Sequence, residues 1–334
     1  MPVQDRARVD PMMNAFNLKD ARAGDYIKKM VHLYPGVWSG FGEIHFKKQE
    51  FSEKIAGGPP SLYSPSIDAI FDVIGEMGAV AVVHCDHDTP YNLALLNDPA
   101  ARAMVFKGSV PKPQYLEAFK AFLKRHPNVP IIWAHFMGNG RGVQPYPEHW
   151  KYLDEMLGDP GFKHVSIDMA WGLIVVPYFI DTPEHLKMTA DLIRKYPDRF
   201  IYGSDQGATA DWGLVKKSYD AWTPLWKEIG PELTRRVVKD NYIRIFFGEK
   251  LLWRTAMWMR SCAICKALMK KLRLSDFVRC QCGWEWQGHT NQKLAATPQA
   301  AYRNLMREGR AGCGKSNRIL HTDQLPKKRE MGLP

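Results

Sequence analysis

The stretch GEMGAVAVVHCD, residues 75–86, shows the pattern that decides the fold. A Gly stop ends a helical segment, an apolar β-rich run follows, and the run ends on a side chain that can bind a metal, His84. Three further runs have the same form: GFGEIH with Glu43, IIWAH with His135 and FIYGSD with Asp205. A parallel barrel gathers the carboxyl ends of its strands around one mouth, so these four side chains can converge there.

Short β-rich runs alternate with longer amphipathic runs, which is typical of βα units and a parallel sheet. The expected strands cover residues 37–45, 79–84, 129–135, 164–169 and 199–204. The expected helices cover residues 21–34, 64–77, 114–125, 149–157, 183–196 and most of 207–247. The sequence therefore predicts an α/β fold, a partial (β/α)8 TIM-type barrel with about five of the eight βα units. The three other strands are expected before Met1.

The alternation stops after Lys250, and the composition changes at the same place. Residues 1–250 contain 30 Lys plus Arg and 30 Asp plus Glu, whereas the remaining residues contain 16 and 5 and so carry the whole net charge of +11. Five of the six Cys residues lie there too. We predict a barrel part over residues 1–248 and a basic, Cys-containing and poorly ordered extension over residues 249–334. The neutral barrel part is not expected to bind nucleic acid.

Two motifs of the extension point to other functions. GRAGCGKS at residues 309–316 fits the P-loop pattern, but a P-loop needs a preceding strand and a following helix, which the sequence there does not favour. The pairs Cys262/Cys265 and Cys280/Cys282 are one residue short of two zinc knuckles. The amino-terminal residues are charged and the apolar runs are too interrupted to cross a bilayer, so a cytoplasmic protein without a transmembrane segment is expected.

Glu, His, His and Asp are side chains that suit Zn²⁺ or a similar divalent ion. A single His after an apolar run is more often a hydrogen-bonded interior residue, but four such side chains at strand ends favour a shared site. We therefore predict that Glu43, His84, His135 and Asp205 bind a divalent metal, with Zn²⁺ as the expected ion.

Further predictions concern the surroundings of this site. Arg141, in a Gly-rich turn, could bind a substrate carboxylate. Trp133 and Trp171 could form the wall of an apolar pocket, although such Trp residues more often belong to the core. Asp86 could line the pocket, with a plain polar loop as the alternative. Asp168 is a candidate partner for one of the metal ligands.

The motifs GEIH, VVHCD, WAHFMG, YGSD and NYIRIF together resemble those of the amidohydrolase-related metal-dependent hydrolases, a family that also includes decarboxylases of aromatic and unsaturated acids. The resemblance covers about residues 1–247. It implies an eight-stranded barrel with one or two divalent ions at its mouth. On this resemblance His84 binds metal, Glu43 touches metal or substrate, His135 binds metal or polarises the substrate, and Asp205 binds metal and acts as general acid and base.

The resemblance implies a reaction, but the sequence lacks one motif of the family. A divalent ion lowers the pKa of its bound water, Asp205 takes up and returns the proton, and His135 stabilises charge on the carbonyl oxygen of a small amide, ester or lactone. The family's first-strand His-x-His pair does not precede Glu43, so the chain is expected to be an N-terminally incomplete barrel. A decarboxylase and an inactive fragment stay open as alternatives. An open barrel edge also predicts association into a homo-oligomer.

Overall fold

The computed structural model describes residues 10–34, 37–48, 58–89, 98–106, 112–140, 143–207 and 211–247, and two short strands, β7 (Val278–Arg279) and β8 (Glu285–Trp286). The chain divides into two compact units, and the larger one, Met12–Ile27 with Gly40–Phe246, carries the parallel sheet. In the smaller unit, β7 and β8 pair antiparallel. Arg141, the P-loop-like motif and the Cys pairs of the extension lie outside the described residues.

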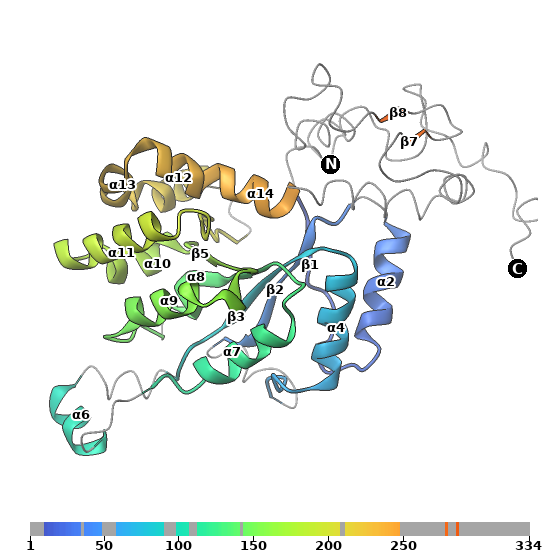
Figure 1. Ribbon diagram of the computed structural model, residues 1–334, viewed down its shortest axis with the longest axis horizontal. Coiled ribbons are helices and arrows are strands. Elements are labelled where there is room, and N and C mark those ends of the chain that lie inside the picture. Colours follow the sequence, from blue (N-terminus) through green and yellow to red (C-terminus); the bar gives the residue numbers. More distant parts are fainter. Residues whose placement is uncertain are drawn as a thin grey trace, which may run out of the picture. The chain divides into compact units, whose positions relative to one another are not determined.

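Six parallel strands form the centre of the larger unit and follow one another in chain order (Figure 1). They are β1 (Met12–Met13), β2 (Gly40–Lys47), β3 (Val80–Cys85), β4 (Ile131–Trp133), β5 (Val165–Asp168) and β6 (Phe200–Ile201). A sheet in which each strand lies beside its predecessor has the order of a βα barrel, whereas a doubly wound sheet reverses its order at a switch point. Among the described strands β1 and β6 do not pair with each other, so the sheet is open. This confirms the predicted α/β fold and partial barrel.

The structure adds β1 to the five expected strands. Met12 pairs with Gly40 and Met13 with Phe41, and two residues are too few to show any alternation in the sequence. Three of the other strands, β4, β5 and β6, end earlier than expected, whereas β2 and β3 extend to Lys47 and Cys85. β4 ends at Trp133 and β6 at Ile201, so the residues that follow them in the predicted runs belong to turns.

The helices occupy the expected stretches. They are α2 (Ala23–Leu33), α4 (Pro65–Glu76), α7 (Leu116–Arg125), α9 (His149–Gly158), α11 (Pro183–Lys195), α12 (Trp212–Asp220), α13 (Thr223–Arg235), the π-helical η2 (Arg236–Asp240) and α14 (Asn241–Phe247). Four further elements were not expected: α6 (Pro99–Phe106), α8 (Ala134–Gly138), the 3-10 helix η1 (Pro160–Phe162) and α10 (Gly172–Phe179). The sequence of α10, GLIVVPYF, is apolar on all sides, so it shows no helical period.

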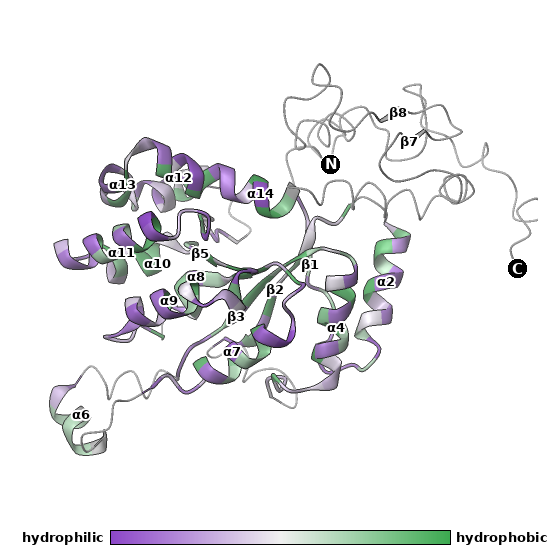
Figure 2. Cartoon of the chain, in the orientation of Figure 1, coloured by the Kyte–Doolittle hydropathy of each residue, from purple (hydrophilic) through white to green (hydrophobic). Residues whose placement is uncertain are grey.

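An aromatic cluster fixes two helices onto the sheet. Phe46 of β2 lies 4.9 Å, between ring centroids, from Phe122 of α7 and 5.9 Å from Phe71 of α4. Each of these rings is fully buried, and burying such a side chain contributes about 1.5–3 kcal/mol. Figure 2 shows that hydrophobic residues dominate strands such as β2, whereas the helices carry hydrophilic faces. The strands therefore present their carboxyl ends on a rigid base.

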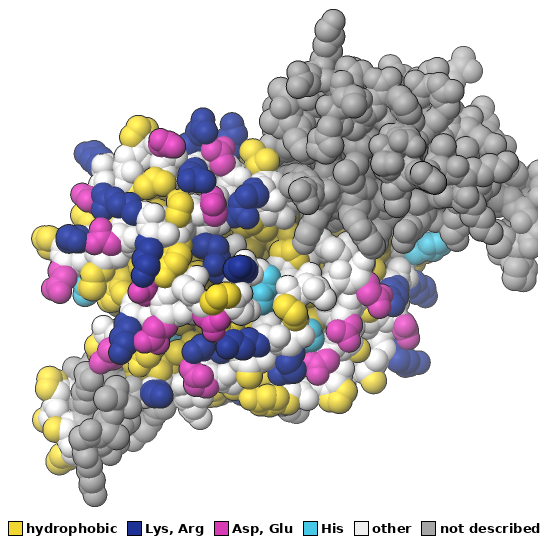
Figure 3. Space-filling view, viewed as in Figure 1, with side chains coloured by type: hydrophobic (Ala, Val, Ile, Leu, Met, Phe, Trp, Pro, Cys, Tyr) yellow, Lys and Arg dark blue, Asp and Glu magenta, His cyan; other side chains and the backbone are white. Residues whose placement is uncertain are grey.

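The surface agrees with the neutral charge of the first 250 residues. On the face shown in Figure 3, Lys and Arg side chains are interspersed with Asp and Glu side chains rather than gathered into one basic patch. None of the described helices is both long enough and apolar enough to cross a lipid bilayer.

Candidate metal centre

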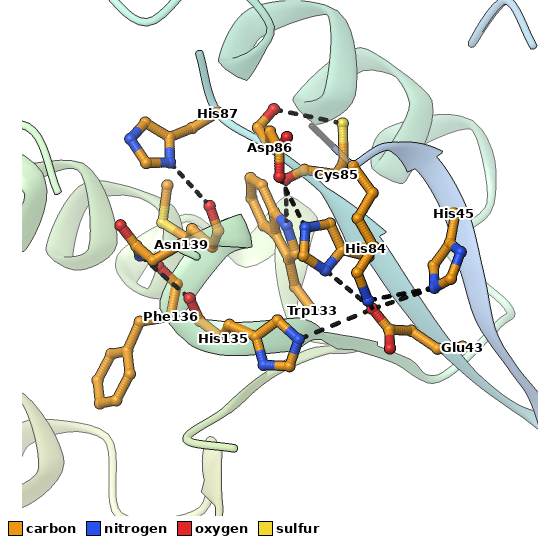
Figure 4. Close-up of polar contacts among 12 residues, drawn as sticks. Glu43, His45, His84, Cys85, Asp86, His87, Trp133, His135, Phe136 and Asn139 are labelled. Atoms are coloured by element: carbon orange, nitrogen blue, oxygen red, sulfur yellow. Dashed lines mark hydrogen bonds and ion pairs between the residues drawn. The ribbon is translucent and has the colours of Figure 1, made fainter. Parts of the chain in front are cut away.

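Three side chains from neighbouring strands converge at one point of the larger unit. They are Glu43 of β2, His84 of β3 and His135, which follows β4 by two residues (Figure 4). One potential ligand atom from each lies within 4.8 Å of the other two. The structure therefore brings together three of the four predicted metal ligands.

Glu43 lies at the centre of this group. Its Oε1 atom is 2.8 Å from His84 Nδ1, 2.8 Å from Lys48 Nζ, 3.5 Å from His45 Nε2 and 3.7 Å from His135 Nε2. Burial raises the pKa of Glu43, but contacts with His135, His45 and His84 outweigh burial and hold the pKa below its usual range. Glu43 is thus a carboxylate that faces four nitrogen-bearing groups.

An irregularity in β2 aims the Glu43 side chain at this point. The register with β3 shifts between Phe41 and Ile44, and such bulges re-aim side chains. Gly42 has a φ of 131°, and a Cβ atom there would lie 2.3 Å from the Val82 carbonyl oxygen. Only glycine allows this approach of the two strands, so Gly42 is needed where Glu43 turns towards His84.

His84 is held from both sides by carboxyl groups. Its Nδ1 atom faces Glu43, and its Nε2 atom is 2.7 Å from Asp86 Oδ1. Burial lowers the pKa of His84, but Asp86 and Glu43 outweigh burial and raise it. These two carboxyl groups thus favour a ring that carries a proton on each nitrogen. A metal could bind His84 only after one of these protons has left.

His135 has the opposite environment. Its ring is buried, and neither ring nitrogen makes a hydrogen bond within the described part of the chain. The nearest carboxyl atoms are Glu43 Oε1 and Asp205 Oδ2, each 3.7 Å from Nε2, and Asp168 Oδ2, 3.9 Å from Nδ1. A buried polar group without a hydrogen bond costs about 1–3 kcal/mol. A cation beside Glu43 would give one of these nitrogens a partner, so the residues present fit a metal.

Two further carboxyl groups lie beside His135: Asp205 near the Nε2 atom that also faces Glu43, and Asp168 near Nδ1. Asp205 has a positive φ of 47° and follows β6. Burial raises its pKa despite the nearby His135. Asp168 ends β5, and burial raises its pKa to about 7. Asp205, predicted as a fourth ligand, therefore lies beside the group of three and outside it.

The backbone that carries His135 is unusual. The sequence predicted a strand through His135, but β4 ends at Trp133 and a left-handed turn follows. In this turn His135, Phe136 and Met137 have φ values of 56°, 49° and 70°. A left-handed conformation costs an L-residue about 1–2 kcal/mol. Gly138 closes the turn, and a Cβ atom there would lie 2.0 Å from the Cys85 carbonyl oxygen.

The other predicted site residues have mixed outcomes. Trp133 is a core residue and not a pocket wall, because it is fully buried, donates from Nε1 to the Cys85 carbonyl at 2.9 Å and packs on Phe119 at 4.5 Å. Trp171 does lie beside the centre, with its ring centroid 5.3 Å from that of His135. Asp86 is buried against His84, a contact that favours holding this His over lining a pocket.

Lys48 and His45 were not predicted from the sequence to belong to the site. Both contact Glu43, and Lys48 Nζ is also 3.3 Å from His45 Nε2. Lys48 follows the end of β2 in an ordinary Lys–Lys pair and gives no signal of its own. His45 alternates with Glu43 along the strand and so faces the same side, which the period of two could have indicated.

A cavity of about 280 Å³ opens beside the centre. Glu43 and His45 form part of its wall, and Asn14, Asn17 and Lys19 form another part, together with apolar side chains. The cavity therefore lies past the carboxyl end of β1 and beside the middle of β2. It offers amide and ammonium donors near the carboxylate of Glu43.

No family model matches the chain. No curated protein matches it significantly. Several solved structures are similar to it. An amidohydrolase from Burkholderia multivorans with bound Zn is 11% identical, with 72% of this chain and 75% of that chain covered and a TM-score of 0.45.

Two other similar structures are enzymes as well. A 2,6-dihydroxybenzoate decarboxylase from Rhizobium is 12% identical, with 73% of this chain and 74% of that chain covered and a TM-score of 0.42. A dihydroorotase from Campylobacter jejuni is 13% identical, with 71% and 64% covered and a TM-score of 0.43. At such low identity and TM-score, the likeness assigns no role to any residue of this chain.

Proposed function

We propose that this chain is a metal-dependent hydrolase of the amidohydrolase-related class. Glu43, His84 and His135 would hold the divalent cation, with Zn²⁺ as the expected ion. The observation that carries the proposal is that both ring nitrogens of His135 are buried and make no hydrogen bond among the described residues, while its Nε2 atom lies 3.7 Å from the Glu43 carboxylate. Imidazole and carboxylate are the donors that Zn²⁺ prefers in catalytic sites.

The chain's own groups have distinct tasks in this proposal. A bound divalent cation supplies Lewis acidity, which activates water and polarises a carbonyl group. Asp205 Oδ2, with its raised pKa, takes up a proton at the reacting centre and returns it to the leaving group. The cavity beside Glu43 and His45 accommodates a small amide, ester or lactone. Trp171 packs against the substrate from the His135 side, and Arg141 binds a substrate carboxylate.

The central test is metal content and turnover of the purified full chain. We expect Zn²⁺ to bind stoichiometrically and to be required for hydrolysis of a compound in a panel of esters, amides and lactones. Chelation should abolish turnover and added Zn²⁺ should restore it. Release of CO₂ from aromatic or unsaturated acids, without hydrolysis in the panel, would replace the hydrolase with the decarboxylase. A well-folded chain that binds no divalent metal would refute both.

Asp205→Asn tests the proton-transfer role. We expect turnover to fall by about 10²–10⁴-fold, because the amide cannot accept the proton, while Zn²⁺ still binds to the other ligands. The matched control is Asp220→Asn, which removes a carboxyl group from the exposed ion pair with Lys216. This control should keep full turnover. An Asp205→Asn variant as active as the unaltered chain would rule out Asp205 as the acid and base.

A further inference from the structure

Buried side chains bind each carbonyl oxygen of the left-handed turn. Asn139 Nδ2 donates to the carbonyl of His135 at 3.0 Å and to that of Phe136 (Figure 4). His149 Nε2 lies 2.7 Å from the same Phe136 carbonyl. His87 Nδ1 lies 3.1 Å from the carbonyl of the third residue, Met137. These three side chains, the turn clamp, are at most 1% exposed.

The turn needs these donors because its backbone supplies few. A right-handed helix satisfies its carbonyl groups with its own N–H groups four residues on. Here the Asn139 N–H reaches the His135 carbonyl at 2.9 Å. The Phe136 carbonyl instead accepts from Asn139 Nδ2 and faces His149 Nε2. The Met137 carbonyl faces His87 Nδ1, whose ring also places Nε2 3.1 Å from the Gln144 carbonyl. Buried carbonyl groups without a partner are strongly disfavoured, so the clamp favours this conformation over others.

The direction of the His135 ring depends on the turn. The Cα–Cβ direction of a residue follows its φ and ψ angles, and a right-handed or extended His135 would point its ring elsewhere. In the left-handed turn, the ring lies 5.1 Å from the His84 ring and 5.3 Å from the Trp171 ring. None of the clamp's hydrogen bonds in the described structure reaches Glu43 or the ring atoms of His84 and His135.

We propose that His87, Asn139 and His149 are positioning residues for His135. By binding the carbonyl groups of the left-handed turn, they keep its imidazole aimed at Glu43 and so set the affinity and geometry of the metal centre. The effect on metal binding rests on the proposed function. The positioning of the ring does not, and it can be measured without any metal.

Two substitutions of His149 distinguish the effect of its N–H group from the effect of its ring size. His149→Phe keeps a ring of similar size and removes the N–H, whereas His149→Gln keeps an N–H near the position of Nε2. The matched control is His164→Phe, because His164 Nε2 makes the same kind of contact, 3.0 Å from the Leu123 carbonyl, elsewhere in the structure. All variants are made in the full chain, and circular dichroism compares their folding.

Titration with Zn²⁺ and the absorption spectrum with Co²⁺ report on the centre. We expect His149→Phe to weaken Zn²⁺ binding by about 10–100-fold, the range for residues that orient metal ligands, and to change the Co²⁺ bands. His149→Gln should restore most of the affinity and the original spectrum. His164→Phe should change neither. A His149→Phe variant with unaltered affinity and spectrum would overturn the proposal.

A metal-free measurement keeps this result apart from the proposed function. Nuclear Overhauser effects between the His135 and Trp171 rings should be present in the unaltered chain, weaken in His149→Phe and return in His149→Gln. If the unaltered chain binds no metal, the proposed function fails, and this comparison still decides the positioning. Unchanged ring contacts in His149→Phe would refute it. If His149→Phe does not fold, His87→Phe tests the clamp at the Met137 carbonyl with the same readouts.

Discussion

The ammonium group of Lys48 competes for the oxygen that a metal would need. It lies 2.8 Å from Glu43 Oε1, the atom that also faces His84 Nδ1 at 2.8 Å. A fixed positive charge at this place repels an incoming cation, and this repulsion is only partly screened because Glu43 is mostly enclosed. Lys48 therefore sets an upper limit on how tightly Glu43 can bind metal.

Lys48→Met should tighten Zn²⁺ binding by about tenfold, equivalent to about 1.4 kcal/mol, as measured by isothermal titration calorimetry. Lys47→Met is the matched control, because the neighbouring Lys47 places its Nζ atom 5.1 Å from the Tyr115 ring centroid instead. Its affinity should equal that of the unaltered chain. Weaker binding in Lys48→Met would mean that Lys48 supports the centre.

The residues of the centre were predictable to different degrees. Glu43, His84 and His135 converge as expected, because the alternation of apolar and amphipathic runs indicates parallel strands and their approximate ends. The turn after β4 was not predictable, since the stretch His135–Met137 contains no Gly to signal a left-handed backbone. The contact of Lys48 with Glu43 depends on side-chain packing that no periodicity encodes. For the same reason the fully buried Trp133 was a poor choice for a pocket wall.

At the scale of elements, the residues at the start of α11 are ones that favour the beginning of a helix. Thr182 is a favoured residue type for the cap of a helix, and its Oγ1 atom accepts a hydrogen bond from the His185 N–H at 3.1 Å. Pro183 occupies the first turn, where its missing N–H costs nothing. By contrast β1 is formed by pairing with β2 alone, so no local signal marks it.

Thr182→Ala should lower the free energy of unfolding by about 1 kcal/mol, because an N–H at the start of α11 loses its acceptor. Chemical denaturation followed by circular dichroism measures this difference. Thr182→Ser keeps the hydroxyl oxygen and should recover most of it. Equal losses in the Ala and Ser variants would show that the methyl group, and not the cap, matters here.

At the scale of the whole molecule, buried His side chains link stability to pH. Burial lowers the pKa of His149 well below its ordinary value of 6.5, even though the Phe136 carbonyl accepts its proton. The unfolded chain then binds a proton below about pH 6.5 that the folded chain does not. The stabilising effect of neutral His149 is therefore complete above pH 6.5 and declines as the pH falls towards its folded pKa.

The stability difference between the unaltered chain and His149→Gln should follow this rule. The difference should be constant above about pH 6.5. Below that pH the unaltered chain should lose stability relative to His149→Gln by up to about 1.4 kcal/mol for each pH unit of acidification. Urea denaturation at pH 7.5, 6.5 and 5.5 provides the comparison, in which other titrating groups cancel. A difference independent of pH would show that His149 takes up its proton in the folded state.

The chain-order arrangement of the strands also bears on how the centre forms during folding. Glu43 and His84 are 41 residues apart in the chain, and His135 follows after a further βα crossover. Such non-local contacts form late, after the loops between them have closed. During synthesis the ligands leave the ribosome in the order of their strands, and His149 of the turn clamp leaves last. A cation captured by this centre would thus mark a chain whose three central βα units are already assembled.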